Sequence, residues 1–309
     1  MISRRNIRVK VMQTLYAIDT MDAETLRPGT ATGLLNEKLD QTCQVFTYLL
    51  YSVTNVALYA ETDAIARSSK HLPSEADLNV NTKIAGNEYV YQLLNDRGFQ
   101  VNLDQWKLKN LPDTEITRKL YTQLVASEIY QEYIQEEGRQ KNKEKQIVEY
   151  IYKEILMKSE LFLQHLEDTF LHWGDDASMM DVLVSNYFNK PQLFNFLQLI
   201  SKEKIDYARE LLLTVIDKKE YCLELIKPKL QNWDPERIAA VDMLLMEMGV
   251  CEFLYFPTIP TKVTINEYID LAKAYSTPQS GQFVNGILDN ILKDLEANKL
   301  VNKVDRAKK

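Results

Sequence analysis

The stretch Lys262–Asp289 reads KVTINEYIDLAKAYSTPQSGQFVNGILD and predicts two helices joined by a short turn. Thr264-Ile265-Asn266-Glu267 has the form of a capping box, in which the Thr hydroxyl and the Glu carboxylate each bond one unpaired N–H at a helix start. This helix should run to about Tyr275 and end before Pro278. A second helix should begin near Ser280, with an apolar face of Phe283, Val284, Ile287, Leu288, Ile291, Leu292 and Leu295.

The FVNG segment inside the second helix contains a glycine at a costly position. Gly in a helix interior is destabilising by about 1 kcal/mol relative to Ala, so Gly286 indicates close approach by another backbone or by a ligand. Asn285 needs hydrogen-bond partners if it is buried. One interpretation is tight helix packing with Asn285 bonded to a loop. The other is a ligand-facing Asn285 beside an exposed Phe283 that stacks on a nucleotide base.

The residues upstream of this stretch predict two more helices. Asp206 to about Leu230 is amphipathic, with a break expected at Lys227-Pro228. Asp234 then has the position of an N-cap and Pro235 that of the first helical residue, where the missing N–H of proline costs nothing. The helix that follows must stop before Pro257, and its expected buried stripe is Ile238, Val241, Leu245 and Met248.

The amino-terminal third predicts one short and one long helix. Ser3 is a suitable N-cap for a helix from Arg4 to about Asp19, in which Ile7, Val11, Leu15 and Ile18 share one face. Apolar residues at near-heptad spacing predict a second helix from Leu34 to about Arg67. A long bundle helix is favoured there over a coiled coil.

Residues 70–82 look like a loop because they are polar and contain Pro73. The charged run at 136–143 indicates a solvated turn between two long helices. The helices expected between residues 86 and 200 are Gly86–Asn95, one near Trp106, Thr114–Glu137, Glu144–Trp173, Ser178–Phe188 and Leu193–Ile200.

The composition is that of a globular, all-helical protein. Only 9 Gly and 9 Pro occur in 309 residues, whereas a sheet-rich chain would need more tight turns. Cys43, Cys222 and Cys251 are odd in number, far apart in the sequence and set among apolar residues, so we expect buried thiols in a reducing cytoplasm. No window approaches 18 uncharged apolar residues, which predicts a cytoplasmic protein without a membrane anchor.

Four cations, Arg4, Arg5, Arg8 and Lys10, occupy the first two turns of the first helix with no acid among them, in a chain of net charge −7. Each cation at a helix N-terminus is unfavourable by about 0.3–1 kcal/mol. A charged arm that only improves solubility is one interpretation. The other is an anion-binding surface, for which a phosphodiester backbone is the usual partner.

The sequence offers little support for catalysis. It lacks a G-x-G-x-x-G motif, a phosphate loop, H-E-x-x-H, C-x-x-C and a serine at a glycine elbow. His165, Asp168 and His172 share one face of an expected helix and are a conceivable metal site, but surface polar residues are the favoured interpretation. We therefore expect no catalytic residue, no metal and no cofactor.

Several motifs resemble one family, that of the bacterial transcription antitermination factor NusB. The first is Arg4-Arg5-Asn6-Ile7-Arg8 followed by Gln13-Thr14-Leu15-Tyr16. The others are Trp233-Asp234-Pro235-Glu236-Arg237-Ile238, the I-N-E-x-x-x-L-A-K pattern of Ile265–Lys273, and Phe283-Val284-Asn285-Gly286-Ile287-Leu288-Asp289. The resemblance covers roughly residues 3–20 and 206–292.

The resemblance implies an all-α fold, a pair of helical bundles with a large helical insertion. Residues 1–20 would form the first helix and 201–298 the carboxy-terminal core. Residues 21–200 would be an insertion of unknown role, and 299–309 a polar tail.

The implied function is binding of boxA-type single-stranded RNA from ribosomal RNA operons, together with the ribosomal protein NusE, within the transcription elongation complex. The resemblance assigns RNA contacts to Arg4, Arg5 and Arg8, with Lys10 as a plausible addition and Phe283 and Asn285 as candidates. It assigns Tyr16 and Asp242 to partner binding.

Several positions depart from the family pattern. Asn6 replaces an arginine, Glu247 stands where the family has an arginine, Cys251 replaces a tyrosine, and the turn 277–279 lacks a frequent acid. Three alternatives stay open: a helical adaptor that has lost RNA binding, a homodimer that covers the basic face, and a methyltransferase-linked role. The last would need a Gly-rich cofactor loop and a nucleophilic cysteine.

Overall fold

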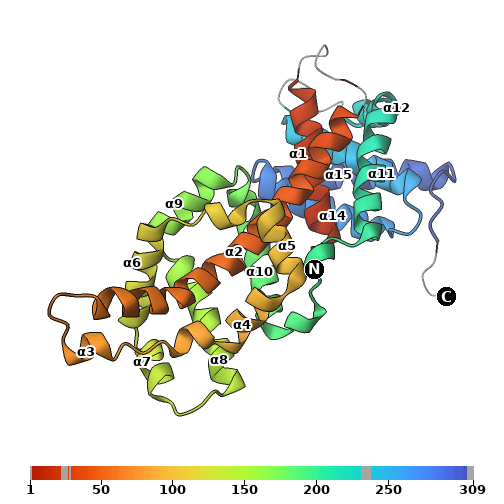
Figure 1. Ribbon diagram of the computed structural model, residues 1–309. Coiled ribbons are helices and arrows are strands. Elements are labelled where there is room, and N and C mark those ends of the chain that lie inside the picture. The colour runs from red at the N-terminus through yellow and green to blue at the C-terminus, as the bar shows by residue number, and fades with distance from the viewer. Residues whose placement is uncertain (1, 22–26, 28, 231–237, 305–309) are drawn as a thin grey trace. The chain divides into compact units, whose positions relative to one another are not determined.

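The computed structural model describes residues 2–21, 27, 29–230 and 238–304. Every regular element in these ranges is a helix, and the fifteen α-helices, α1 to α15, confirm the all-α prediction (Figure 1). Among the described helices, none is both long and apolar enough to cross a membrane. Asp234 and Pro235, the predicted cap, lie outside the described residues.

The chain divides into two compact units. We call Ser3–Leu39 with Ile200–Lys309 the terminal unit, and Met1–Ile2 with Asp40–Leu199 the middle unit. The division falls inside α2 (Thr30–Ser68), so that one continuous helix contributes to both. The boundaries at residues 20, 200 and 298 stay predictions, because compactness does not reveal which part of a chain is an insertion.

Helix α1 (Arg4–Asp19) has the bounds that its apolar spacing predicts. A capping box starts it: the Asn6 N–H donates to Ser3 Oγ at 3.3 Å, and the Ser3 N–H donates to Asn6 Oδ1 at 3.1 Å. Asn6 therefore bonds the helix start at the position where the family has another arginine. The buried face includes Ile7, Val11 and Leu15.

Helix α13 (Ala240–Tyr255) is the central helix of the terminal unit. All residues from Leu244 to Phe253 are buried, so the helix is enclosed on every side, as expected for one that is apolar all round. Its neighbours are α1, α11 (Lys202–Asp217), α12 (Lys219–Ile226), α14 (Thr261–Tyr275) and α15 (Ser280–Ala297).

The capping box predicted at Thr264 and Glu267 is wrong. Helix α14 begins at Thr261, directly after Pro260, so Thr264 lies inside the helix. Its hydroxyl donates to Glu252 Oε2 at 2.9 Å, because a buried carboxylate on α13 needs hydrogen-bond donors. Helix α15 begins at Ser280, as predicted.

The middle unit contains more and shorter helices than the apolar pattern predicts. Thr114–Glu137 is two helices, Glu144–Trp173 is two helices around a π-helical segment, and the 70–82 loop contains a helical turn. The elements are the greater part of α2, α3 (Glu75–Leu78), α4 (Glu88–Asn95), α5 (Arg97–Gln105), α6 (Thr114–Val125), α7 (Glu128–Gln135), α8 (Lys141–Tyr150), the π-helix Ile151–Leu156, α9 (Glu160–Thr169) and α10 (Trp173–Asn189).

Side chains that bond nearby backbone groups account for these breaks. The Ser127 hydroxyl donates to the Leu124 carbonyl at 2.6 Å between α6 and α7, and Ser159 caps α9. The helix predicted at Leu193–Ile200 is wrong. Two 3₁₀ turns, Pro191–Leu193 and Phe196–Gln198, replace it.

Gly249 has a crowded position in a helix, as Gly98 and Gly281 also have, whereas Gly286 does not. A Cβ atom on Gly249 would lie 2.9 Å from Leu288 Cδ2 and 3.4 Å from Tyr268 Cδ2, so α13 approaches α14 and α15 closely there. A Cβ atom on Gly286 would meet nothing within 4 Å, and Gly286 is exposed. The close approach that we expected at Gly286 is therefore absent.

We predict opposite stability changes for alanine at these two glycines. Gly249→Ala should lower the free energy of unfolding by about 1–3 kcal/mol, because the added methyl group displaces the buried Leu288 side chain. Gly286→Ala should raise it by about 0.5–1 kcal/mol, because alanine loses less backbone entropy in a helix. Urea unfolding followed by circular dichroism measures both, and equal shifts would contradict the packing at Gly249.

Candidate nucleic-acid interface

A surface cavity of about 460 Å³ lies in the terminal unit, between the first turns of α1 and the segment that leads into α14. Pro257 and Pro260 interrupt the helical chain between α13 and α14. We call this cavity the arginine groove. It is lined by Ser3, Arg4, Arg5, Arg8, Thr258, Ile259, Pro260, Val263 and Glu267.

Arg8 forms the floor of the groove through a buried ion pair with Glu252. Its Nε donates to Glu252 Oε1 at 2.7 Å and its Nη2 to Oε2 at 3.1 Å, and the two side chains are 2% and 0% exposed. Burial alone would lower the pKa of Arg8, but the Glu252 carboxylate outweighs it, so the pKa is raised and the guanidinium stays charged.

Glu252 accepts further hydrogen bonds from three other helical residues. The hydroxyl groups of Tyr207, Thr264 and Tyr268 all donate to its carboxylate. Burial, followed by the charge of Glu252, raises the pKa of both tyrosines well above the usual value, so their hydroxyls remain protonated donors. The carboxylate is therefore fully bonded, which a buried charge requires.

Lys303 bonds the carboxy-terminal end of α13. Its Nζ donates to the carbonyls of Glu252 at 2.7 Å and Phe256 at 2.9 Å. A cation at a helix C-terminus bonds carbonyls that have no partner within the helix. Burial lowers the pKa of Lys303 to about 8, against the opposite effect of the Glu252 charge.

Arg4 and Arg5 lie at the rim of the groove, with side chains 28% and 48% exposed. Arg4 pairs with Glu203 and lies 5.5 Å from the centre of the Tyr207 ring. Arg5 donates to Glu267 at 3.0 Å and to Asp270 at 2.6 Å, and the hydrogen bond that it donates to Glu267 is the main cause of its raised pKa. The guanidinium groups of Arg4 and Arg5 are therefore both paired with carboxylates.

Two of the four cations that we expected to be exposed are buried. Arg8 is 2% exposed and Lys10 is 1% exposed, and Lys10 does not line the groove. Phe283, expected to be exposed, is only 9% exposed because it lies on the packed face of α15. Asn285 is exposed on α15, and neither α15 residue lines the groove.

The two residues assigned to partner binding differ in exposure. Tyr16 is 46% exposed near the end of α1. Asp242 is only 5% exposed, and its Oδ2 accepts a hydrogen bond from the Ser280 hydroxyl at 2.7 Å. Asp242 therefore connects α13 to the start of α15, where Ser276 and Thr277 also bond Ser280.

The residues that sequence reasoning missed are the acidic partners of the arginines. Glu252 carries one signal in the sequence, because it is a charge inside the apolar run MGVCEFLYF. A charge in such a run must be paired when the helix is buried. Glu203, Glu267 and Asp270 lie on amphipathic helices among other exposed acids and carry no comparable signal.

The structure does not support the histidine cluster as a metal site. His165 bonds the Tyr48 hydroxyl at 2.7 Å, and His172 lies beyond the end of α9 at Thr169. Within the described ranges, no group of three metal-ligating side chains is found. The cysteines are free and buried, as predicted, but the Sγ atoms of Cys222 and Cys251 lie only 3.4 Å apart.

Glu247, which departs from the family pattern, is buried on α13 with a 2% exposed side chain. Its Oε2 has no hydrogen-bond partner in the described part of the chain. Burial raises the pKa of Glu247 to about 7. The Lys219 charge opposes this shift, and the charges of Asp19 and Glu220 add to it.

We predict that the pair Arg8–Glu252 is strongly coupled. Arg8→Met should lower the free energy of unfolding by about 3–5 kcal/mol, because it leaves the Glu252 carboxylate buried without its cation. The double variant Arg8→Met/Glu252→Gln should recover part of this loss, since the neutral amide still accepts hydrogen bonds from the surrounding hydroxyls. A double-mutant cycle in urea measures the coupling, and additive losses would contradict it.

We also predict that Glu247 makes stability depend on pH. Its folded pKa of about 7 exceeds the unfolded value of 4.5, so the folded state binds more protons between these values and stability falls as pH rises through this window. Glu247→Gln should match the parent near pH 4 and be more stable by up to about 3 kcal/mol at pH 8. The exposed Glu296→Gln is the control, because Glu296 is not among the charges that act on Glu247, and a pH-independent effect of Glu247→Gln would refute the shift.

Comparison with known proteins identifies the terminal unit. Residues 184–293 match the model of the NusB family, a range that contains α11 to α14 and most of α15 but not α1. The transcription antitermination protein NusB of Salinibacter ruber is 43% identical over 101 residues, covering 33% of this chain and 63% of the relative. The match thus spans less than two thirds of that protein. No solved structure matches.

Two other relatives are covered more completely. The NusB protein of Finegoldia magna is 38% identical over 99 residues, which cover 32% of this chain and 72% of the relative. That of Methylacidiphilum infernorum is 42% identical over 101 residues, which cover 33% of this chain and 70% of the relative. Because the match to these two relatives is 38% and 42% identical and covers more than two thirds of each, the chain belongs to the NusB family.

Proposed function

We propose that this protein is an RNA-binding transcription antitermination factor. It binds boxA-type leader RNA of ribosomal RNA operons together with NusE and supports their transcription within the elongation complex. The observation that carries the proposal is the arginine groove, in which Arg4 and Arg5 lie at the N-terminus of α1 beside a cavity of about 460 Å³. Guanidinium groups at a helix N-terminus form a surface suited to phosphate.

Within this proposal the predicted residues have different roles. Arg4 and Arg5 contact RNA phosphates from the rim, and Asn285, exposed on α15, is a second polar contact. Arg8 positions the groove through Glu252. Lys10 and Phe283 act through packing, because both are buried.

The protein partner is assigned to a different surface. Tyr16 faces NusE from the exposed side of α1, and Asp242 supports that surface by holding α15. Residues 1–20 and 201–298 form the family core in this proposal, and 21–200 are inserted. No catalytic residue and no cofactor is assigned, the cytoplasm is the expected compartment, and a homodimer that covers the basic face stays an alternative.

The carboxylates that now hold the rim arginines would be exchanged for phosphate. Glu203, paired with Arg4, is 73% exposed, and Asp270, paired with Arg5, is 44% exposed. Exposed ion pairs contribute little net stability, so breaking these two pairs is a small barrier to RNA binding. Glu267, the other partner of Arg5, is only 21% exposed and accepts two hydrogen bonds from Arg5. The same pairs support the second candidate function, a helical adaptor in which the arginines only bond within the protein.

We predict that Arg4→Ala/Arg5→Ala weakens RNA binding and reduces its salt dependence. Each phosphate contact contributes about −0.7 to the slope of log affinity against log salt for single strands, so the slope should become less negative by about 1.4. Filter binding of boxA-type RNA to the full chain, with and without NusE, at several salt concentrations measures this.

Two further variants serve as controls. Arg118→Ala removes an exposed cation of the middle unit and should leave affinity and slope unchanged. Glu203→Gln removes the carboxylate that competes for Arg4 and should raise RNA affinity severalfold. Retention of NusE in a pull-down without any RNA binding would replace the proposal with the adaptor function.

A further inference from the structure

The excess negative charge of the chain is confined to one unit. Residues 40–199 contain 23 Asp and Glu against 15 Lys and Arg, whereas the rest of the chain contains 21 against 22. A surface with this balance attracts cationic partners and repels phosphate. The middle unit is therefore unsuited to RNA and suited to a basic partner.

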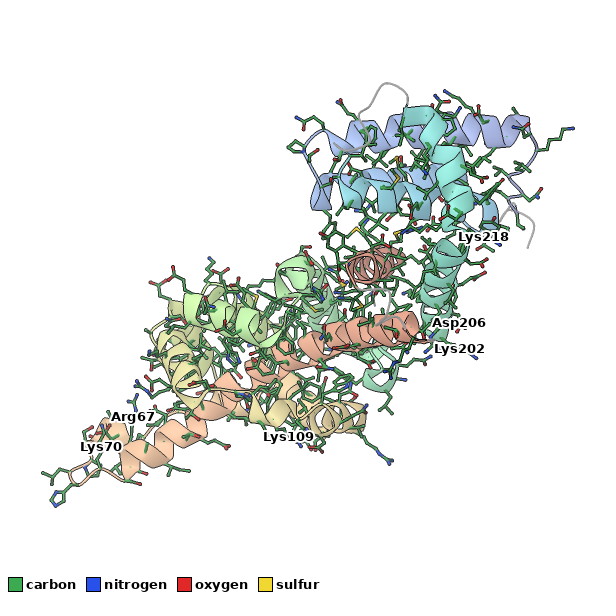
Figure 2. All side chains as sticks on the ribbon, turned by 90° about the horizontal axis from the view of Figure 1, so that it is seen from above. Arg67, Lys70, Lys109, Lys202, Asp206 and Lys218 are labelled. Carbon is green, nitrogen blue, oxygen red and sulfur yellow. The ribbon has the colours of Figure 1, made fainter. Side chains whose placement is uncertain are left out.

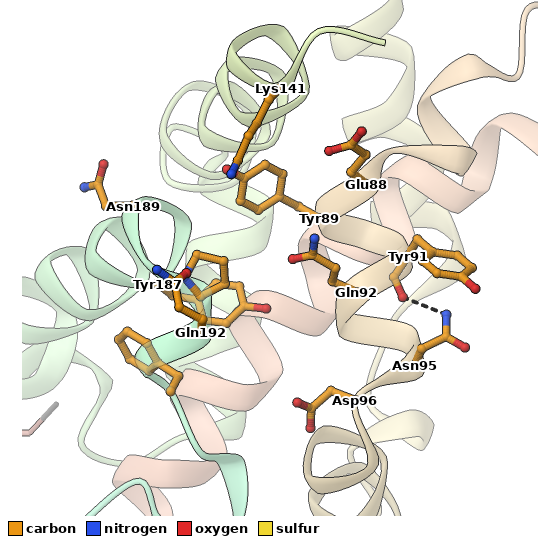
Figure 3. Close-up of a pocket in the computed structure, with 12 residues that line it drawn as sticks. Glu88, Tyr89, Tyr91, Gln92, Asn95, Asp96, Lys141, Tyr187, Asn189 and Gln192 are labelled. Atoms are coloured by element: carbon orange, nitrogen blue, oxygen red, sulfur yellow. Dashed lines mark hydrogen bonds between the residues drawn. The ribbon is translucent and has the colours of Figure 1, made fainter.

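A cavity of about 730 Å³ lies in the middle unit, within the range of roughly 300–1,000 Å³ that is usual for ligand sites. It is bounded by α4, by Lys141 at the start of α8, and by the end of α10 with the turn Pro191–Leu193 (Figure 3). We call it the tyrosine pocket. This pocket lies outside the terminal unit and has no part in the RNA proposal above.

The two helices on one side of the pocket are held together by buried hydrogen bonds. The Asn87 side chain donates to the Glu144 carbonyl at 2.8 Å, and the Glu88 N–H donates to Glu144 Oε2 at 2.8 Å. Glu144 is itself 0% exposed and paired with Arg139 at 2.9 Å. The start of α4 is thus fixed against α8, and the pocket is preformed.

Two buried tyrosines supply donors to this pocket. Tyr89 and Tyr187 line it and are 5% and 3% exposed, and neither hydroxyl group bonds another residue within the described ranges. Burial raises the pKa of both hydroxyl groups. The charge of Asp96 adds to the shift of Tyr187, and the charges of Glu149 and then Glu88 add to that of Tyr89. Figure 3 shows the Tyr187 hydroxyl directed toward α4. These hydroxyls are therefore protonated and available to a ligand.

The charged groups of the pocket are mainly acidic. Glu88 and Asp96 lie at the two ends of α4, and Lys141 is the one cation among the described lining residues. Asp96 Oδ1 accepts the Phe99 N–H at 2.8 Å as the cap of α5, while Oδ2 remains open to a ligand. The Gln92 side chain points into the space between them (Figure 3).

We propose that the tyrosine pocket binds an extended peptide segment of a partner protein through a basic side chain. The Asp96 carboxylate pairs with this cation at one end of α4, and the Glu88 carboxylate pairs with a second basic side chain at the other end. The tyrosine hydroxyls and the Gln92 amide bond the peptide backbone. Arginine is preferred over lysine, because a planar guanidinium stacks on an aromatic ring such as the half-buried Phe194.

The test uses a labelled peptide, Ser-Arg-Gly-Arg-Gly-Ser, titrated into the full chain by fluorescence anisotropy. A second peptide carries citrulline, the neutral counterpart of arginine, in place of both arginines. The arginine peptide should bind and the citrulline peptide should not. Glu88→Gln and Asp96→Asn should each weaken binding about tenfold, and asparagine preserves the cap of α5.

Glu132→Gln is the matched control, because it removes an exposed charge of the same unit outside the pocket and should leave affinity unchanged. Arg4→Ala/Arg5→Ala should bind the peptide like the parent, so failure of the RNA proposal leaves this one intact. Hydrogen exchange of the parent should show peptide protection of residues 87–97 and 187–194.

Three results would overturn the proposal. The first is equal binding of the arginine and citrulline peptides, and the second is pocket variants that behave like Glu132→Gln. The third is an oligouridine RNA that protects residues 87–97 and 187–194 while the arginine peptide does not, which would make the pocket a nucleic-acid site.

Discussion

The buried ion pair between Arg8 and Glu252 is the interaction on which the terminal unit depends. Glu252 lies on α13, which is enclosed on every side, and an unpaired carboxylate there would cost several kcal/mol. Arg8 supplies the matching charge, with a fork that bonds both carboxylate oxygens. The first turns of α1 must therefore pack against α13 in one register, and Arg4, one turn before Arg8, then lies at the rim of the groove.

This pair also explains how a helix tolerates cations at its positive end. Carboxylates from other helices compensate them: Glu203 on α11 holds Arg4, and Glu267 on α14 holds Arg5. The unfavourable effect of the helix dipole is thus offset by tertiary contacts. The groove combines the buried, paired Arg8 with Arg4 and Arg5 at its rim. Figure 2 shows Lys202 and Asp206 on α11, the helix that carries Glu203, and Lys218 at its end.

The charge balance differs between the two units. The terminal unit carries the family motifs and the arginine groove, and its charge is nearly balanced. The middle unit carries the negative charge and a pocket with tyrosine hydroxyls. Under the RNA proposal, the acidic middle unit would not compete with the terminal unit for phosphate, because its negative charge repels phosphate.

The sequence by itself determined the all-helical class, the family, and the bounds of α1, because apolar spacing and a cap such as Ser3 act within a few residues. It did not determine that Arg8 is buried, that Thr264 bonds Glu252 instead of capping a helix, or that Gly249 is crowded and Gly286 is not. Only the tertiary structure decided these features. Each depends on a partner on another helix, at a distance in sequence that no local pattern encodes.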